Sequence, residues 1–298
     1  MGTDTRSTTR GLLAALIMSL VLSACATQSA AAPPIHQTIQ NKGSDTLVNL
    51  ALAWAEAYAG VQGDVAVSVT GGGSGTGIAA LFNGTADLAN ASRALNPDEE
   101  AAAQAAGFEA VQTPVALDAI AVVVNPANPV DRLTIPQLAD IYSGRITNWR
   151  DVGGEDRPIV LLSRESNSGT YMYFLEQVVR QGSSDCEDLF SANALLMPSS
   201  EGISSEVRQN PNVIGYDGLG YVTPDQKVVA VSTGPGSPYV VPSAETVVDG
   251  SYPIARPLYM VTRGEPAGAV ADYLAWIRGP QGQAIVSQLG FVPLQAEE

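Results

Sequence analysis

Short runs rich in valine and isoleucine alternate along this chain with segments whose apolar residues recur every three or four positions. The runs predict β-strands, and the recurring spacing predicts amphipathic helices. Alternation of this kind predicts an α/β fold with largely parallel sheets. The expected strands cover 65–69, 119–124, 159–162, 213–216, 228–231 and 258–261. The clearest expected helices cover 47–58, 78–82, 135–142, 171–179 and 270–277, and 232–243 is expected to be a loop.

The N-terminal segment has the parts of an export signal in the usual order. Arg6 and Arg10 precede an apolar run over 11–22, which is shorter than the ~20 residues that a membrane-spanning helix needs. The run ends in Leu-Ser-Ala-Cys, which resembles the bacterial lipoprotein cleavage box, so we expect residues 1–24 to be a signal peptide and Cys25 to carry a lipid. An ordinary signal peptide cut near 30–32 is the alternative. The small and polar residues that follow predict a flexible tether over 25–38.

The charge balance argues against nucleic acid as a partner. The chain has 30 Asp and Glu against 15 Lys and Arg, and removal of two arginines and one aspartate with the signal takes the formal net charge from −15 to −16. An anionic ligand remains compatible with this charge, because local dipoles dominate inside a small buried site.

Enzyme classes find little support in the sequence. The single histidine, His36, lies in the expected tether, so no Ser-His-Asp unit can be assembled in the folded body. There is no phosphate loop and no dinucleotide fingerprint. Cys186 is the only cysteine after Cys25, so neither a disulfide within the body nor a His/Cys metal site is expected. A magnesium or calcium site held by carboxylates stays open, and no cofactor is expected.

Three segments place glycine, serine and threonine where a helix is expected to begin. They are 42–46, 71–77 and 164–170, and the last also contains Arg164. A helix N-terminus carries unpaired N–H groups and a partial positive charge, so it is suited to bind an anion. Glycine permits close backbone approach, hydroxyls add donors, and an arginine can hold two oxygens at once. If the three segments converge, they would enclose a small tetrahedral anion without a metal.

These motifs occur together in an order and rough spacing similar to those of the phosphate-binding, PstS-like family. The matching stretches are 43–46, 73–77, 86–89, 138–149, 164–170 and 279–294, so the resemblance covers about 39–294. It implies a two-lobed periplasmic-binding-protein-like (type II) fold with a ligand cleft between the lobes. It further implies an extracytoplasmic, monomeric protein that delivers inorganic phosphate to the membrane permease of an ABC transporter by hinge closure.

The resemblance also implies the domain bounds and the ligand contacts. Lobe one is expected over 36–114 plus 255–298 and lobe two over 115–254, with hinges near 112–117 and 253–257. The implied ligand residues are Ser44, Asp45, Thr46, Ser74, Gly75, Asp87, Arg164, Ser168, Gly169 and Thr170.

Asp87 is assigned the role of accepting a hydrogen bond from a protonated phosphate oxygen, which unprotonated sulfate cannot offer. Two positions depart from the family pattern. Asp45 stands where some members have threonine or serine, so its side chain either faces away or accepts a ligand proton. Ser166 stands where some members place a carboxylate that orients the arginine, so Arg164 is expected to be held differently.

Two alternatives remain within the binding class. A binder of sulfate, molybdate or tungstate would use a similar cage of hydroxyls and amides. A phosphate sensor would have the same sequence features as a transport protein.

Overall fold

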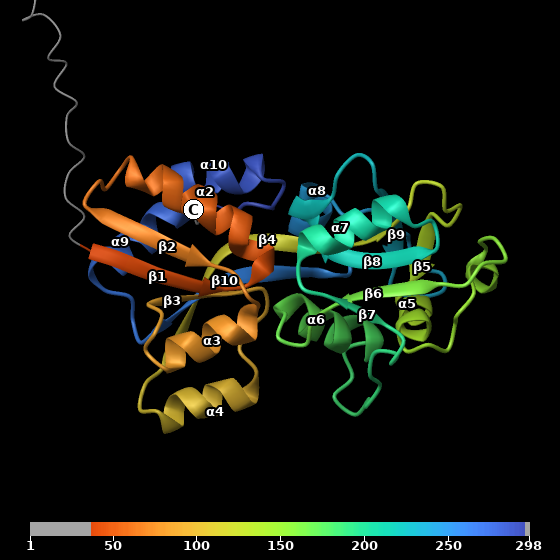
Figure 1. Cartoon of the computed structure of the whole chain (residues 1–298), viewed down its shortest axis with the longest axis horizontal. Helices are drawn as coiled ribbons and strands as arrows, with labels where there is room; N and C mark the ends of the chain where they lie inside the picture. Colours follow the sequence, from red (N-terminus) through yellow and green to blue (C-terminus); the bar gives the residue numbers. More distant parts are fainter. Residues whose placement is uncertain (1–36, 296–298) are drawn as a thin grey trace, which may run out of the picture. The chain divides into compact units, whose positions relative to one another are not determined.

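The computed structural model describes residues 37–295, which form a mixed α/β fold, as the sequence predicts (Figure 1). The strands are β1 (Gln37–Gly43), β2 (Val65–Thr70), β3 (Leu88–Ala91), β4 (Ala110–Val124), β5 (Arg132–Thr134), β6 (Val160–Arg164), β7 (Leu195–Met197), β8 (Val213–Gly218), β9 (Lys227–Ser232) and β10 (Ala255–Arg263). The α-helices are α2 (Val48–Ala59), α3 (Ser74–Phe82), α4 (Pro97–Ala105), α5 (Ile135–Tyr142), α6 (Gly169–Phe174), α7 (Ser200–Gln209), α8 (Ala244–Val248), α9 (Gly268–Arg278) and α10 (Pro280–Gln288).

The strands join in the order β2-β1-β3-β10-β4-β8-β6-β7, with β9 beside β4 and β5 beside β9. The ladders among β1, β2 and β3, among β6, β7 and β8, and between β5 and β9 are parallel. The ladders that β10 makes with β3 and β4, and that β4 makes with β8 and β9, are antiparallel. The sheet is therefore mixed, and the expectation of largely parallel sheets holds only away from β4 and β10.

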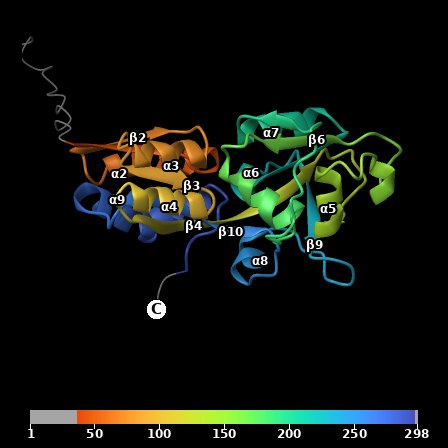
Figure 2. The ribbon, with the colours of Figure 1, turned by 90° about the horizontal axis from the view of Figure 1, so that it is seen from below.

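The long strand β4 takes part in two hydrophobic cores, and it runs beside β10 between them (Figures 1 and 2). Val115 and Ala116 pack in a core with α2, α9 and α10, which also contains Trp54. Ala119, Ile120, Val122 and Val124 pack in a second core with α5, α6, β8 and β9. We call these the first and second halves of the body. The lobe bounds inferred from the sequence stay a prediction, and the two cores divide along β4 between Ala116 and Ala119.

Helices cover both faces of the strands in the first half. In Figure 1, α2 and α10 lie on one side of β1 and β2, and α3 and α4 lie on the other. The helix starts follow the sequence signals: Thr134 caps α5 by accepting the N–H of Gln137, and Pro136 stands in the first turn. The segments that follow Gly43, Gly73 and Asn167 at the ends of β1, β2 and β6 position the candidate site.

Each of the six strands expected from the sequence is present, usually longer by a few residues, and the loop over 232–243 contributes only a bridge between Val231 and Val240. The expected tether is wrong at its end, because Gln37 and Thr38 already belong to β1, where they pair with Val65 and Ala66. Parallel pairing gives these polar residues the backbone partners that the sequence pattern does not show. The signal segment, Cys25 and His36 lie outside the described residues. Within 37–295, no helix is long and apolar enough to cross a membrane.

Candidate functional site

The first of the three expected segments lies at the carboxyl end of β1. Gly43 ends the strand with a φ of 143°, and a Cβ there would collide with the carbonyl oxygen of Asn90. The N–H of Ser44 donates to that same oxygen at 2.8 Å, which fixes the segment against the end of β3. Ser44 and Thr46 are buried, and a short 3-10 turn from Asp45 leads into α2. Two hydroxyls and a carboxylate therefore gather where β1 and β3 end.

The second segment connects β2 to α3. Gly72 and Gly73 have φ values of 123° and 93°, a region that favours glycine, and α3 begins directly after them at Ser74. The Oγ of Ser74 accepts the N–H of Ser92 at 3.1 Å and lies 3.3 Å from the Oγ of Ser92. This segment is thus also anchored at the end of β3, beside the first one.

The third segment connects β6 to α6 in the second half. Ser168 caps α6, because its Oγ accepts the N–H groups of Thr170 at 3.2 Å and Tyr171 at 3.4 Å. Gly169 is buried against the second segment, and a Cβ at this position would collide with the Oγ of Ser74. A larger residue at 169 would therefore push α6 away from α3.

The three segments meet through direct hydrogen bonds. Gly75 donates its N–H to the carbonyl oxygen of Asn167 at 3.0 Å, and the Nδ2 of Asn167 donates to the carbonyl oxygen of Gly72 at 2.9 Å. The hydroxyls of Thr46 and Thr170 share a hydrogen bond of 2.8 Å. Residues far apart in the chain thus form one buried group, which we call the junction cluster: Ser44, Thr46, Ser74, Gly169 and Thr170.

The junction cluster contains unused backbone donors. The first turn of any helix leaves N–H groups without partners inside the helix. In α3 and α6 some of these groups are satisfied by Asn167 and Ser168, whereas the N–H groups of Ser74 and Gly169 have no partner among residues 37–295. Because α3 begins at Ser74, its positive end adds to the attraction for an anion.

Arg164 is held next to the cluster by a network of acceptors. Its side chain is buried, Nη1 donates to the Oγ of Ser200 at 2.9 Å, and Nη2 donates to the carbonyl oxygen of Pro198 at 3.1 Å. Nη2 also lies 3.1 Å from Oδ2 of Asp45, which accepts the N–H of Ser200 at 2.9 Å. Asp45 therefore supplies from the first half the orienting carboxylate that Ser166 does not provide.

A second buried arginine, Arg256, contacts the junction cluster through Thr170. Arg256 of β10 pairs with Asp118 of β4, with Nε and Nη2 at 3.2 Å and 2.9 Å from Oδ2, and neither side chain has exposed surface. Nη2 also donates to the Oγ1 of Thr170 at 2.9 Å. Burial raises the pKa of the Asp118 carboxyl, and the neighbouring Arg256 charge opposes this rise. One guanidinium thus links the strands of the first half to the third segment.

A second carboxyl, Asp217, is buried at the end of β8 close to these groups. Its Oδ1 accepts the N–H of Gly218 at 2.9 Å, and its Oδ2 has no hydrogen-bond partner among the described residues. Burial raises the pKa of Asp217 to about 7, against the opposing effect of the Arg164 charge. Burial therefore favours the protonated, neutral form of this carboxyl.

Comparison with known proteins identifies the family. The profile of the PBP superfamily domain matches residues 28–280. The phosphate-binding protein PstS of Pseudomonas aeruginosa is 33% identical over 280 residues, which are 88% of this chain and 85% of that protein. PstS of Bacillus subtilis is 30% identical over 253 residues, covering 85% of this chain and 79% of its own length.

The fold agrees with this relationship. The crystal structure of a putative phosphate ABC transporter substrate-binding protein from Clostridium perfringens, solved with bound phosphate, superimposes with a TM-score of 0.77 at 31% identity. The match covers 87% of this chain and all of that one. This chain belongs to the PstS-like family of the PBP superfamily. The periplasmic-binding-protein-like fold expected from the sequence is thereby confirmed.

Asp87, assigned from the family pattern to the ligand, lies elsewhere in the structure. Its side chain is exposed, and its Oδ2 accepts the N–H of Gln40 at 2.7 Å. In the parallel pairing of β1 with β3, Gly43 lies opposite Asn90, so Asp87 stands at the amino end of β3 and the junction cluster at the carboxyl end. At ~3.3 Å per residue, three residues separate the two by roughly 10 Å. Asp87 is therefore not part of the junction cluster, and its role in ligand binding stays a prediction from the sequence.

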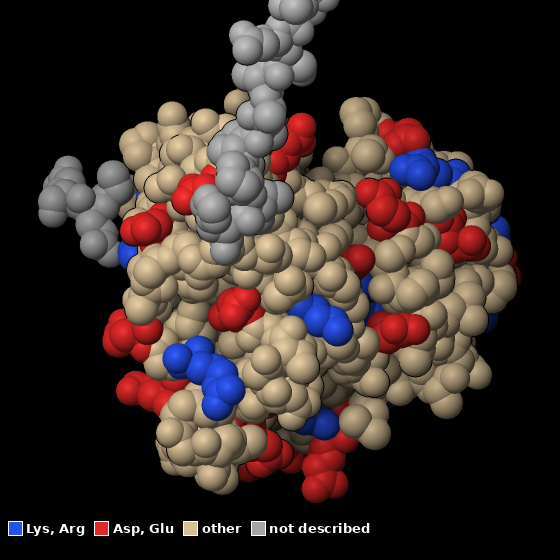
Figure 3. Space-filling view, turned by 60° about the vertical axis from the view of Figure 1, so that its left-hand side comes forward, with Lys and Arg blue, Asp and Glu red and all other residues tan. Residues whose placement is uncertain are grey.

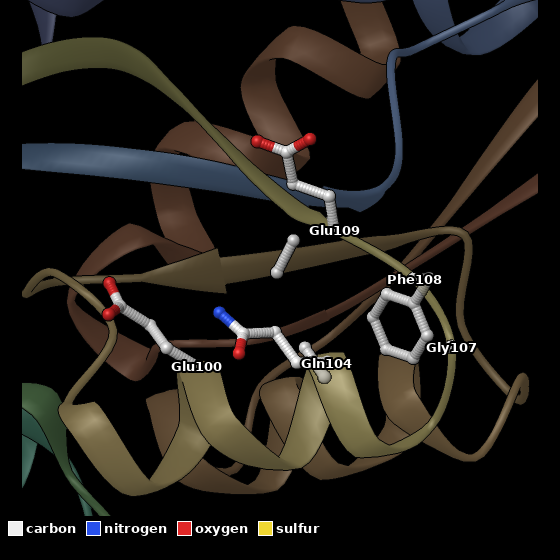
Figure 4. A pocket seen from close by; sticks show the side chains of 7 residues that line it. Glu100, Gln104, Gly107, Phe108 and Glu109 are labelled. Atoms are coloured by element: carbon white, nitrogen blue, oxygen red, sulfur yellow. The ribbon is translucent and has the colours of Figure 1, made fainter.

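One well-formed pocket shares no lining residue with the junction cluster. It has a volume of about 540 Å³ and lies beside α4. Figure 4 shows Glu100 and Gln104 on the helix, with Phe108 and Glu109 in the segment that follows it. Two carboxylates at this pocket would repel a phosphate-like anion.

The surface offers no alternative basic site on the face drawn in Figure 3, where the acidic and basic side chains are scattered among neutral ones. The buried donors and arginines of the junction region supply a local attraction for an anion.

The structure adds contacts that the sequence did not indicate. They come from Asn167, Ser92, Ser200, Asp118, Asp217 and Arg256. Asn167 lies inside a motif that was noted, so its polar side chain was an available signal. Asp118 and Arg256 lie within strand-like runs, and an isolated charge in such a run was the signal that could have drawn attention to them.

Proposed function

We propose that this chain is an extracytoplasmic solute-binding protein that captures inorganic phosphate at the junction cluster and delivers it to an ABC importer. The observation that carries the proposal is the convergence of the three segments, marked by the 2.8 Å contact between Thr46 and Thr170. The relatives named PstS and the phosphate-bound structure from Clostridium perfringens support phosphate as the ligand.

The donors available around the cluster suit a tetrahedral oxyanion. The free N–H groups of Ser74 and Gly169, the hydroxyl of Ser44 and whichever of the Thr46 and Thr170 hydroxyls does not donate to the other can donate to the four oxygens of the anion. Each such bond to a charged acceptor contributes ~1.5–3 kcal/mol in a desolvated site. The site then needs no metal, because fixed dipoles and hydroxyls replace the hydration shell of the anion.

Asp45 is the carboxylate that we propose for discrimination between phosphate and sulfate. It belongs to the first segment, and its Oδ2 is occupied by Arg164 and the N–H of Ser200. Its Oδ1 is then the oxygen available to a protonated phosphate. An unprotonated sulfate oxygen at the same place would meet only repulsion.

Capture would require the two halves to separate and close. Thr46 and Thr170 contact each other directly, as do Gly75 and Asn167, so a ligand reaches the cluster only when these contacts open. β4 and β10 run between the two cores, which makes the stretches near 112–117 and 253–257 the proposed hinges.

We also propose that Cys25 carries the lipid that holds the protein at the outer face of the membrane. The support is the order of basic residues, apolar run and Leu-Ser-Ala-Cys in the sequence. The wild-type protein should sediment with membranes and the Cys25→Ala variant should not. Equal membrane association of the two would argue against the anchor.

Calorimetric titration tests the proposed ligand. Phosphate should bind to the purified mature protein at least a hundredfold more tightly than sulfate, with molybdate and tungstate titrated in parallel. Equal affinity for phosphate and sulfate would exclude the phosphate assignment. Tighter binding of one of the other oxyanions would select the alternative that the sequence leaves open.

A further inference from the structure

The buried pair of Arg256 and Asp118 has a donor that the protein does not use. The Nη1 of Arg256 is buried and has no hydrogen-bond partner among the described residues. An unpaired N–H on a buried cation is costly, because the group has lost water without gaining an acceptor. Such a group is therefore a candidate contact for a ligand.

The planar guanidinium fixes where this donor points. Nε and Nη2 share Oδ2 of Asp118, so this edge of the fork is occupied. The second N–H of Nη2 donates to the Oγ1 of Thr170 at 2.9 Å. At the end of a guanidinium, one N–H of each Nη runs parallel to the other. Nη1 has two unused N–H groups, and the one at the end of the fork therefore points in the same direction as the bond to Thr170, toward the junction cluster.

The neighbours of Arg256 favour retention of its charge and position. Asp118 is opposite it in the antiparallel ladder of β4 and β10, so the pair is built into the sheet. Tyr173 lies with its ring 5.6 Å from the guanidinium carbon. Thr170 in turn bonds to Thr46, so Arg256 contacts the third segment directly and is linked to the first segment through Thr170.

We propose that Arg256 is a second cationic ligand of the oxyanion site, and that its Nη1 donates to an oxygen of the bound anion beside Thr170. This inference rests on the proposed function. Arg164 then approaches the anion from the second half and Arg256 from the strands that run between the halves, and the two together offset its double negative charge. Asp118 sets the orientation of Arg256 and screens part of its charge when no ligand is bound.

The test compares phosphate affinity in the wild-type protein and three variants by calorimetry, with folding checked by circular dichroism. Arg256→Lys keeps the charge but removes the planar fork, so phosphate should bind at least tenfold more weakly. Asp118→Asn keeps an oxygen that can accept from Arg256 and hold its orientation, but removes the screening charge, so phosphate should bind as tightly as to the wild type or more tightly. Arg263→Lys, on the same strand but stacked on Phe108, is the matched control and should stay within twofold of the wild type.

Two outcomes would overturn the inference. One is an Arg256→Lys affinity within twofold of the wild type, and the other is an equal loss in Arg256→Lys and Asp118→Asn, which a purely structural pair would produce. If Asp118→Asn does not fold, the neutral double variant Asp118→Asn with Arg256→Gln replaces it. This double variant should bind phosphate at least tenfold more weakly than the wild type. Phosphate binding within twofold of the wild type would overturn the inference. A wild-type protein that fails to bind phosphate refutes the proposed function itself, whereas normal wild-type binding with an unaffected Arg256→Lys refutes only this inference.

Discussion

The two buried arginine–carboxylate pairs at the site differ in how they are built. Arg256 and Asp118 face each other across one antiparallel ladder and have no exposed surface. Arg164 and Asp45 come from different halves of the body, and the side chain of Asp45 is 18% exposed. The first pair is present whenever the sheet is folded, whereas the second forms only when the halves are together. One pair is therefore a permanent part of the sheet, and the other would form and break in the closure that we propose.

The largest effect on stability should come from the pair built into the sheet, Arg256 and Asp118. Asp118→Asn leaves the buried charge of Arg256 without its partner, so the free energy of unfolding should fall by about 3–5 kcal/mol. Urea denaturation of the ligand-free protein measures this change. A loss below about 1 kcal/mol would show that the pair is not part of the folded frame.

The pair of Arg164 and Asp45 should contribute less to the stability of the folded protein and more to the affinity for the ligand. Arg164→Ala should weaken phosphate binding by roughly 2–4 kcal/mol, because a charged donor and its ordered carboxylate are lost. The ligand-free melting temperature should fall less than in Asp118→Asn. Calorimetry and thermal melting of the same preparations check both statements, and normal phosphate affinity in Arg164→Ala would remove the third segment from the site.

Asp217, which belongs to neither pair, should make the stability of the protein depend on pH. Burial raises the pKa of Asp217 to about 7 in the folded protein, from 3.8 in the unfolded chain. Between these values the folded state keeps a proton that the unfolded state loses, so this contribution to stability declines as the pH rises and is lost above about 7. Asp217→Asn should abolish the decline and gain up to about 4 kcal/mol relative to the wild type between pH 4 and pH 8.

Urea denaturation of the wild type and Asp217→Asn at pH 4, 6 and 8 measures that difference. Parallel curves for the two proteins would mean that Asp217 titrates normally. Because both proteins share all other titrating groups, the difference isolates this one carboxyl.

The smallest effect should come from Asp87, which lies outside both pairs. Asp87→Asn should leave the ratio of phosphate to sulfate affinity within twofold of the wild type, since its side chain faces solvent beside Gln40. Its effect on the free energy of unfolding should stay within about 0.5 kcal/mol. A large loss of selectivity would return Asp87 to the site and contradict its position in the structure.

The two pairs also show what the sequence could predict. The three segments were predicted because each places small residues directly before a helix pattern, and the second and third also follow a strand run. Arg164 was found because it belongs to one of these local patterns. Arg256 and Asp118 were missed, because their meeting depends on the register of two antiparallel strands that are far apart in the chain.

Asp87 is the opposite case, a residue that the sequence assigned to the site and the structure places away from the junction cluster. A short family motif placed it in the site, but a motif does not specify which end of a strand a residue occupies. The register of β1 with β3 decides this, and it puts Asn90 at the cluster and Asp87 at the far end. The role of Asp45 depended in the same way on a partner from the other half, so the sequence left its orientation open.

Crystals grown with arsenate, a tetrahedral analogue of phosphate with a strong anomalous signal, test the central claim most directly. The anomalous peak of the arsenic should lie among Thr46, Ser74 and Thr170. The arsenate oxygens should lie ~2.7–3.1 Å from the backbone nitrogens of Ser74 and Gly169. A peak outside the junction cluster, beside Asp87 or in the pocket next to α4, would contradict the account.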